Sequence, residues 1–351
     1  MDRPLQAGVS VIICCYNSAS RIGVTLKHIA LQKVPEGIPW EVIIVDNNST
    51  DDTRIKALQE WEQHHVTVSF KIIPEPKAGL IYARQKGISE AKYDLLLFCD
   101  DDNWLEENYI RYAHEIMNSN KSVAILGGMS YGNFESEKPG WFDTFQNAYA
   151  IGKPLKQSGI ANNRTYIAGA GMVVRKELFE LLDKLQFTPL LTGRKGNELL
   201  SGEDSEISMM TLFLGYDLYY DERLKFTHFI TEKRLSWKYC VSMIAWGHAI
   251  PQIYFEFYNF CRGRIPDNKE ILFGDAYKVI LSNAIRRVIK SFSPFWQSLK
   301  RLIKQQPGSK KEIEIKAAFN KLKYLLLYKS RLRNEFDTIS SLMLRINQNK
   351  N

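Results

Sequence analysis

Five short apolar runs, rich in β-branched residues, alternate with amphipathic segments along the first 130 residues of the chain. The runs are Val9–Cys15, Glu41–Asn47, Val68–Ile73, Tyr93–Asp100 and Val123–Gly128. Segments with helical spacing of apolar residues lie between most of them, at Ser18–Leu31, Asp51–His64, Gly79–Ala91 and Glu106–Asn118. Continuous apolar strands separated by helices are typical of a mostly parallel sheet that helices cover on both faces. We therefore expect an α/β fold.

Acidic and amide side chains follow two of these runs. Asp46 and Asn47 end the second run, and the fourth leads directly into Asp100, Asp101 and Asp102. Ligands of parallel sheets bind beyond the carboxyl ends of the strands, so we expect these residues at one edge. Carboxylates there can hold Mg²⁺ or Mn²⁺ while phosphates complete the metal's coordination. Alternatively, the acids favour the dipole of the helix that follows, and the residues alone leave both interpretations open.

Two helix starts have the spacing of a capping box, in which a serine and an acid three residues later satisfy backbone N–H groups. Ser49 and Asp52 form the first match, which leaves Asp46 and Asn47 unexplained. The second match is Ser201 with Asp204, in the stretch SGEDSE. A carboxylate at that helix start can instead take a proton from an attacking hydroxyl group, as a general base does.

A serine hydrolase is an alternative that we weigh against the following residues. Gly128–Gly132 matches the GxSxG pattern around Ser130, and Asp204 and His228 follow in the order that a hydrolase triad needs. The pattern requires a helix directly after the serine, however, and the chain continues as YGNFESEKPGW without apolar periodicity. A lone histidine such as His228, followed by Phe229 and Ile230, is usually a core residue.

The second half of the chain is less regular. We expect long ordered loops over 131–195, a helix from Glu203 to about Gly215, a strand near Tyr216–Tyr220, and helices from about Trp237 onward with a break at Gln306–Ser309. This predicts one domain over 1–235, with halves of about 9–130 and 131–235, and a helical region over 236–351. The apolar stretch Tyr239–Phe260 contains His248, Pro251, Gln252, Glu256 and Asn259, which favours a buried amphipathic helix over a membrane span.

Charge is unevenly distributed along the chain. Residues 265–351 hold 18 Lys and Arg against 7 Asp and Glu, a net of +11, which leaves −3 of the total of +8 for the rest. The stretch Ala276–Lys304 interleaves apolar and basic residues, which suits an anionic membrane surface, an oligomer contact or a solvated helical face. A non-catalytic membrane-binding adaptor is therefore a further alternative. We expect no nucleic-acid partner, because no nucleic-acid-binding fold signature accompanies the charge.

The cysteines and the first residues bear on the compartment. The five cysteines are odd in number and form no CxxC pair, which favours a reducing compartment over a disulfide framework. The start, MDRPLQAG, has no apolar segment of the kind found in signal peptides. We therefore expect a cytoplasmic protein, peripheral on the inner face of the cell membrane if the basic region binds lipid.

Taken in order, these motifs resemble the family 2 inverting glycosyltransferases of the GT-A fold. The matching stretches, which together cover about residues 9–235, are VSVIICCYNSASRIGVTL, EVIIVDNNSTDDT, GLIYARQKGISEAKYDLLLFCDDDNWL, AGAGMVVRKELFE and SGEDSEISMMTLFLGYDLYY. The resemblance implies transfer of a sugar from a nucleoside-diphosphate sugar, with a UDP-sugar favoured, to a hydroxyl of a glycan or lipid-linked glycan, as in cell-envelope polysaccharide synthesis. It also implies Mn²⁺ or Mg²⁺ as cofactor.

The resemblance also implies roles for single residues. It assigns nucleotide-sugar binding to Cys14, Tyr16, Asp46, Asn47, Arg84 and Asp101, with Asp101 near the ribose. Asn47 stands where the family often has a second acid that contacts the base, so the base is not determined by this position. Asp102 is implied as the best metal ligand, with Asp100 weaker and His228 completing the shell. Asp204 is implied as the catalytic base, beside Glu203.

Overall fold

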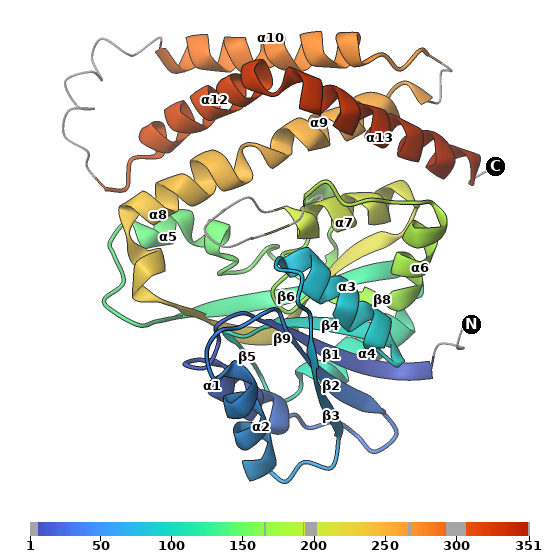
Figure 1. The fold of residues 1–351 in the computed structure, drawn as a ribbon, viewed down its shortest axis with the longest axis vertical. Coiled ribbons are helices and arrows are strands. Elements are labelled where there is room, and N and C mark those ends of the chain that lie inside the picture. Colours follow the sequence, from blue (N-terminus) through green and yellow to red (C-terminus); the bar gives the residue numbers. More distant parts are fainter. Residues whose placement is uncertain are drawn as a thin grey trace. The chain divides into compact units, whose positions relative to one another are not determined.

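The computed structural model describes residues 6–164, 166–191, 193, 202–265, 269–292 and 307–349. The chain forms two compact units (Figure 1). The first consists of Met1–Glu137, Gln146–Asp183 and Glu203–Glu232. The second consists of Lys138–Phe145, Lys184–Gly202 and Lys233–Asn351. Every residue of the candidate active site belongs to the first unit.

The first unit is built on a nine-stranded sheet within the described residues, in the order β3-β2-β1-β4-β8-β6-β9-β5, with β7 also paired to β9. The strands are β1 Gln6–Cys15, β2 Trp40–Asp46, β3 Ser69–Pro74, β4 Tyr93–Asp100, β5 Asn103–Leu105, β6 Val123–Phe134, β7 Gly159–Ile160, β8 Val173–Arg175 and β9 Asp217–Ile230. Strands β3, β2, β1 and β4 are parallel, as are β6 and β9, whereas β8 runs antiparallel to β4 and β6. The predicted α/β fold is confirmed.

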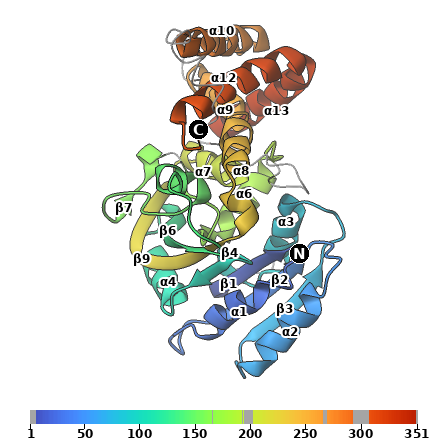
Figure 2. The ribbon, with the colours of Figure 1, turned by 90° about the vertical axis from the view of Figure 1, so that its left-hand side faces the viewer.

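Helices cover both faces of the parallel strands, as Figure 2 shows for α1, α2 and α3. The helices of the first unit are α1 Ile22–Ala30, α2 Thr53–Gln63, α3 Leu80–Glu90, α4 Tyr109–Ser119, α6 Lys176–Lys184 and α7 Glu203–Phe213. Val11 and Ile13 of β1 share a buried core with residues of α1, α2 and α4. On the opposite face a Cβ on Gly87 of α3 would lie 2.5 Å from Cγ2 of Ile12. Helix α3 therefore packs so close to β1 that only glycine fits at this position. Apolar residues on both faces explain the continuous apolar runs.

The second unit is helical. Its helices are α5 Phe142–Phe145, α8 Trp237–Ser242, α9 Pro251–Arg262, α10 Phe273–Phe292, α12 Lys310–Leu327 and α13 Lys329–Gln348, with a π-helical turn at Met243–His248. Figure 1 shows α10 beside α12, and α9 beside α13. The expected break precedes α12, where Ser309 Oγ accepts a hydrogen bond from the Glu312 backbone N–H at 3.2 Å. Gln306 and the part of Ala276–Lys304 beyond residue 292 lie outside the described residues.

The apolar stretch Tyr239–Phe260 is divided among α8, the π-helical turn and α9, and Ile253, Tyr254 and Phe257 are buried. The prediction of a buried amphipathic segment is confirmed. Among the described residues, no helix combines the length and the hydropathy that a membrane crossing requires.

Two expectations for the second half of the chain are wrong in detail. The stretch expected to be loop contains the end of β6, strand β8 and helix α6. The strand expected at Tyr216–Tyr220 is the 14-residue β9. Strand β8 has only three residues, too few to show a period, and the charged residues Asp221, Glu222 and Arg223 interrupt the alternation of buried positions along β9.

Candidate active site

The register of the parallel strands brings three predicted site residues together. Cys14 at the end of β1 pairs with Asp100 at the end of β4, and its neighbour Cys15 pairs with Asp46 at the end of β2. Asn47 follows directly, and its backbone N–H donates to the Cys15 carbonyl at 2.8 Å. The expected gathering of polar residues at the carboxyl edge of the sheet is therefore present, because parallel strands end on the same side.

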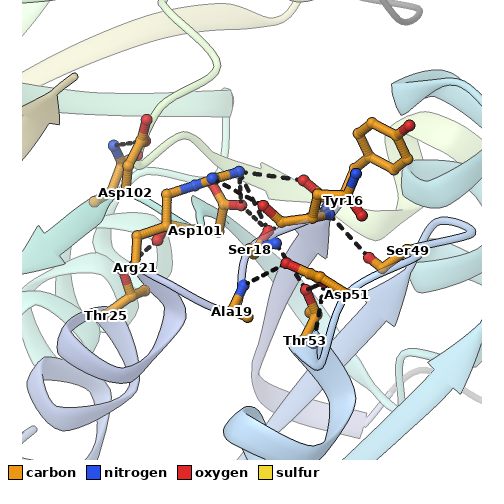
Figure 3. Close-up of polar contacts among 12 residues, drawn as sticks. Tyr16, Ser18, Ala19, Arg21, Thr25, Ser49, Asp51, Thr53, Asp101 and Asp102 are labelled. Carbon is orange, nitrogen blue, oxygen red and sulfur yellow. Dashed lines mark hydrogen bonds and ion pairs between the residues drawn. The ribbon is translucent and has the colours of Figure 1, made fainter. Parts of the chain in front are cut away.

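The middle aspartate of the triplet faces the segment between β1 and α1 rather than open space (Figure 3). Asp101 Oδ2 lies 2.7 Å from Arg21 Nη2 and accepts a hydrogen bond from the Ser18 hydroxyl. The hydroxyl of Thr25 on α1 donates to the Asp101 carbonyl at 2.8 Å. Arg21 also donates to the Asn17 carbonyl at 3.1 Å. These contacts join the turn that contains Asp101, between β4 and β5, to α1 and to the loop before it.

Asp101 is buried, and its environment opposes its charge. Burial raises the pKa of Asp101 to about 6, the neighbouring Asp102 adds to this, and Arg21 and Ser18 act in the opposite direction. The pKa in the folded protein therefore lies above the ordinary value for aspartate of about 4. Since the folded state then holds more protons between these values, stability falls as pH rises from about 4 to about 6.

We expect Arg21→Met to destabilise the metal-free protein by about 1–3 kcal/mol at neutral pH, because a buried carboxylate loses its cation. The variant should raise the pKa of Asp101 further, so the loss in free energy of unfolding should be greater at pH 8 than at pH 5. Urea denaturation in EDTA at both pH values measures this. Arg54→Met is the control, because its side chain is 57% exposed and lies 3.9 Å from Asp46. Equal losses at the two pH values would contradict the assignment.

The third aspartate faces a histidine of β9. Asp102 Oδ1 lies 3.6 Å from Nε2 of His228, and strand pairing of Asn103 with His228 sets this approach. His228 is buried, and its Nδ1 lies 2.9 Å from the Tyr149 carbonyl. A carbonyl only accepts, so Nδ1 carries a hydrogen, and Nε2 is the ring nitrogen that faces Asp102. His228 is thus a core residue, as its neighbours indicate, and also a potential ligand.

These residues suit a divalent ion that is held by two side chains and by phosphate oxygens. A histidine whose other ring nitrogen is anchored to a carbonyl is the usual form of a metal ligand. Mg²⁺ and Mn²⁺ often take only one or two carboxylates from the protein when a substrate supplies phosphates. Within the described part of the chain, no group of three or more His, Cys, Asp or Glu side chains is already gathered as a metal site.

Arg84 of α3 connects the first half of the site to the start of α7. Its Nη1 lies 3.3 Å from Oε1 of Glu203, and its guanidinium lies over the ring of Phe98. Burial lowers the pKa of Arg84, but Glu203, Asp100 and Asp204 more than offset this and raise it. The guanidinium therefore interacts electrostatically both with the carboxylate at the end of β4 and with those at the start of α7.

Both carboxylate oxygens of Asp204 accept backbone hydrogen bonds. Oδ2 accepts from Gly169 N–H at 2.9 Å, and Oδ1 accepts from Ser205 N–H at 2.7 Å. A Cβ on Gly169 would lie 2.8 Å from Nη2 of Arg84 and 3.5 Å from Cβ of Asp204, so a larger residue there would displace the arginine. Ser201, the expected partner of Asp204 in a capping box, lies outside the described residues.

The capping box predicted for Ser49 and Asp52 is wrong. Asp52 precedes α2 without a side-chain capping bond. Ser49 Oγ instead accepts from the Asn17 backbone N–H at 3.0 Å, and Asp51 Oδ1 accepts from the Thr53 backbone N–H at 3.1 Å (Figure 3). Ser49 therefore bonds the loop after β1 rather than the first turn of α2, because that loop lies against the turn between β2 and α2.

Cys14 and Tyr16 have different surroundings. Burial raises the pKa of the Cys14 thiol to about 12, so it stays protonated. Tyr16, just beyond β1, is 51% exposed, and Figure 3 shows its ring pointing away from the Arg21–Asp101 pair. Asp46 is buried, and its Oδ1 accepts from the Ser49 backbone N–H at 3.2 Å.

The serine hydrolase alternative is wrong. Ser130 lies inside β6, is 2% exposed, and donates its hydroxyl hydrogen to the Ala150 carbonyl. No helix follows it, since β6 continues to Phe134. A serine inside a strand cannot present its oxygen as a nucleophile elbow does.

Sequence patterns did not identify several residues of this site. Arg21 and Ser18 contact Asp101, which lies 80 and 83 positions away, and Tyr149 contacts His228, 79 positions away. No local sequence pattern marks these three residues. Gly169 belongs to a Gly-Ala-Gly stretch that resembles a fragment of a dinucleotide motif. That glycine could have been recognised only from the residues that pack against it.

A family model described as "Glycosyl transferase family 2" matches residues 10–182. The poly-beta-1,6-N-acetyl-D-glucosamine synthase of Staphylococcus epidermidis is 25% identical over 170 residues, which are 48% of this chain and 40% of that protein. This chain therefore spans less than half of the length of that relative. Glycosyltransferase GlyG of Streptococcus pneumoniae serotype 4 is 25% identical over 240 residues, which are 65% of this chain and 75% of that protein.

Among solved structures, S. aureus TarS 1–349 in complex with UDP is similar to this chain with a TM-score of 0.49 and 16% identity. The likeness covers 97% of this chain and 92% of that one. At these values it carries no information about function.

Proposed function

Residues 10–182 belong to glycosyl transferase family 2, which confirms the resemblance seen in the sequence, and from this premise we propose that the chain is an inverting glycosyltransferase. It transfers a sugar from a nucleoside-diphosphate sugar, with UDP as the favoured nucleotide, to a hydroxyl group of a glycan or lipid-linked glycan. The relative named as a poly-beta-1,6-N-acetyl-D-glucosamine synthase supports a glycan acceptor.

The observation that carries this proposal is the position of Arg84. Its guanidinium forms an ion pair with Glu203 at 3.3 Å and is also attracted by the charges of Asp100 and Asp204. A buried cation between carboxylates at the end of β4 and at the start of α7 suits a substrate with two ends: a diphosphate beside the first group and a reacting hydroxyl beside the second. Arg84 is then the nucleotide-contacting arginine, and Cys14, Tyr16 and Asp46 line the nucleoside side.

Asp204 acts as the general base. The backbone N–H groups of Gly169 and Ser205 hold its two oxygens in place, and each oxygen keeps a further lone pair that can accept a proton. The acceptor hydroxyl gives its proton to Asp204 while its oxygen bonds to the anomeric carbon. The bond from that carbon to the diphosphate breaks, and the electron pair leaves with the diphosphate. A single displacement inverts the anomeric configuration. Glu203, paired with Arg84, positions the start of α7.

Asp102 and His228 are the side chains that would hold Mn²⁺ or Mg²⁺, with Asp100 as a weaker contributor. When bound, such an ion neutralises charge on the departing diphosphate. Asp102 is oriented by Asn103, whose amide donates to Oδ1 at 3.1 Å, and His228 is oriented by the Tyr149 carbonyl. Both side chains are thus held before a nucleotide arrives.

A thermal-shift series tests this function directly. UDP, GDP, CDP and ADP are each added with and without Mn²⁺, and the preferred nucleotide's sugar derivatives are then assayed for transfer to glycan acceptors. We expect one nucleoside diphosphate to raise the melting temperature more in Mn²⁺ than in EDTA. A non-catalytic adaptor would show no metal-dependent affinity for any nucleotide, so four negative results would overturn the proposal.

We also propose that the protein is cytoplasmic and that α10 binds an anionic membrane surface. Two adjacent lines of side chains along the surface of α10 are exposed. One consists of Lys278, Ile285 and Ile289, and the other of Val279, Arg286 and Lys290. Val279, Ile285 and Ile289 are 51%, 41% and 64% exposed. Aliphatic side chains that alternate with cations fit the boundary between acyl chains and anionic headgroups.

We expect Lys278→Glu, Arg286→Glu and Lys290→Glu together to weaken binding to vesicles of phosphatidylglycerol and phosphatidylcholine by at least tenfold. Each basic residue near such a surface contributes about 1 kcal/mol. Sedimentation with vesicles measures the change. The control reverses Lys27, Lys56 and Lys92, which are exposed on the first unit, so the net charge changes equally. Similar binding by both triple variants would contradict a specific role for α10.

A further inference from the structure

Asn47 uses its side-chain amide on the chain's own backbone. Its Nδ2 donates to the carbonyls of Glu75 at 3.0 Å and Lys77 at 2.7 Å, and its Oδ1 accepts from the Gly79 N–H at 2.8 Å. The residue is only 6% exposed. Both amide hydrogens are therefore spent on the loop of residues 75–79, which connects β3 to α3.

The chemistry of these three bonds requires an amide and excludes a carboxylate. Two of the partners are carbonyl oxygens, which need donors, and the third is an N–H group, which needs an acceptor. An aspartate of the same shape would keep the bond to Gly79 but place negative charge against two carbonyl oxygens. The departure from the family's second acid at this position thus has a local physical reason.

The loop that Asn47 holds sets the start of α3. Gly79 precedes α3 with a φ of +135°, which side chains rarely adopt, so the loop enters the helix in one glycine-dependent conformation. The Glu75 N–H donates to the Asp46 carbonyl at 2.9 Å, which adds a backbone bond between β2 and the loop. Arg84 follows one turn into α3, where it pairs with Glu203.

We propose that Asn47 is a positioning residue, which clips the 75–79 loop to the end of β2 and thereby sets α3 and Arg84, and that its side chain does not read the nucleotide base. The second part rests on the proposed function. Since Arg84 would contact the diphosphate group, which all these nucleotides share, loss of the clip weakens the binding of every nucleoside diphosphate to the same extent. A residue that reads the base would change their ranking instead.

Asn47→Asp separates the two roles by the direction of its effect. It restores the acid of the family pattern, so a base-reading position should gain affinity for UDP or change the order among UDP, GDP and CDP. If Asn47 is a clip, the variant should instead lose about tenfold in affinity for each nucleotide, because its hydrogen bonds to the Glu75 and Lys77 carbonyls are lost. Isothermal titration in Mn²⁺ measures the three affinities. Asn48→Asp is the matched control, because it adds the same charge at the neighbouring, exposed position.

Hydrogen exchange tests the clip even if no nucleotide binds. In Asn47→Ala the Gly79 amide loses its acceptor, and we expect exchange over residues 75–79 to be about tenfold faster than in the wild type. Asn48→Asp should leave it unchanged. Unaltered exchange in Asn47→Ala would overturn the clip itself. Faster exchange together with a changed nucleotide ranking in Asn47→Asp would overturn the claim that Asn47 does not read the base. Absence of nucleotide binding by the wild type would contradict only the proposed function.

Discussion

Asp204→Asn should lower the rate of sugar transfer by about 10²–10⁴-fold, the usual worth of a general base, and leave the affinity for the donor nucleotide nearly unchanged. The amide has nearly the same volume as the carboxylate but does not take a proton from a hydroxyl group. Steady-state transfer rates and titration of the preferred nucleoside diphosphate measure the two effects separately.

The variant also has a structural cost that must be separated from the catalytic one. Asp204 accepts from Gly169 and Ser205 with different oxygens, and an amide nitrogen cannot replace one of them. We therefore expect a loss in stability of about 1.5–3 kcal/mol, as for a hydrogen bond to a charged group. Ser205→Ala, which removes only the 3.3 Å contact of its hydroxyl with Asp204, is the control and should stay active.

Glu203→Gln distinguishes the two acids at the start of α7. It loses the ion pair with Arg84 but keeps hydrogen-bonding capacity, so its transfer rate should fall less than that of Asp204→Asn. A fully active Asp204→Asn enzyme, or a larger loss in Glu203→Gln, would contradict the assignment of the base.

Asp102→Ala should reduce transfer by at least about 10²–10³-fold and remove the dependence of nucleotide affinity on Mn²⁺. The magnitude is that of losing one electrostatic stabiliser of developing charge. His228→Ala should have a smaller effect, of about 10–100-fold in Mn²⁺ affinity, which is typical of a supporting contact at a metal site. Titration of UDP in Mn²⁺ and in EDTA measures both.

Asp52→Ala is the matched control, because Asp52 is an exposed acid near the same edge of the sheet. It should bind nucleotide with the same metal dependence as the wild type. If Asp102→Ala kept its turnover and its Mn²⁺ dependence, the aspartate triplet would not be a metal site. If His228→Ala had no effect on Mn²⁺ affinity, His228 would be a core residue alone.

Strand positions were predictable where the side-chain pattern itself records burial. The run Tyr93–Asp100 was predicted with the bounds that β4 has, because its apolar residues are buried on both faces of the sheet. Helix starts were less predictable. The segment expected to begin a helix at Ser18 has α1 only from Ile22, because Ser18 and Arg21 bind Asp101 instead.

The sequence by itself determined the α/β fold, the carboxyl edge where Asp46 and Asp100 meet, and the family, because apolar periodicity and motif order are local properties of a chain. Only the tertiary structure decided what the polar side chains do at that edge. Asp101 binds Arg21, and Asn47 binds the 75–79 loop. The physical reason is that a buried polar group must find a partner, and the partner is chosen by which distant backbone and side-chain atoms the fold brings within hydrogen-bonding distance.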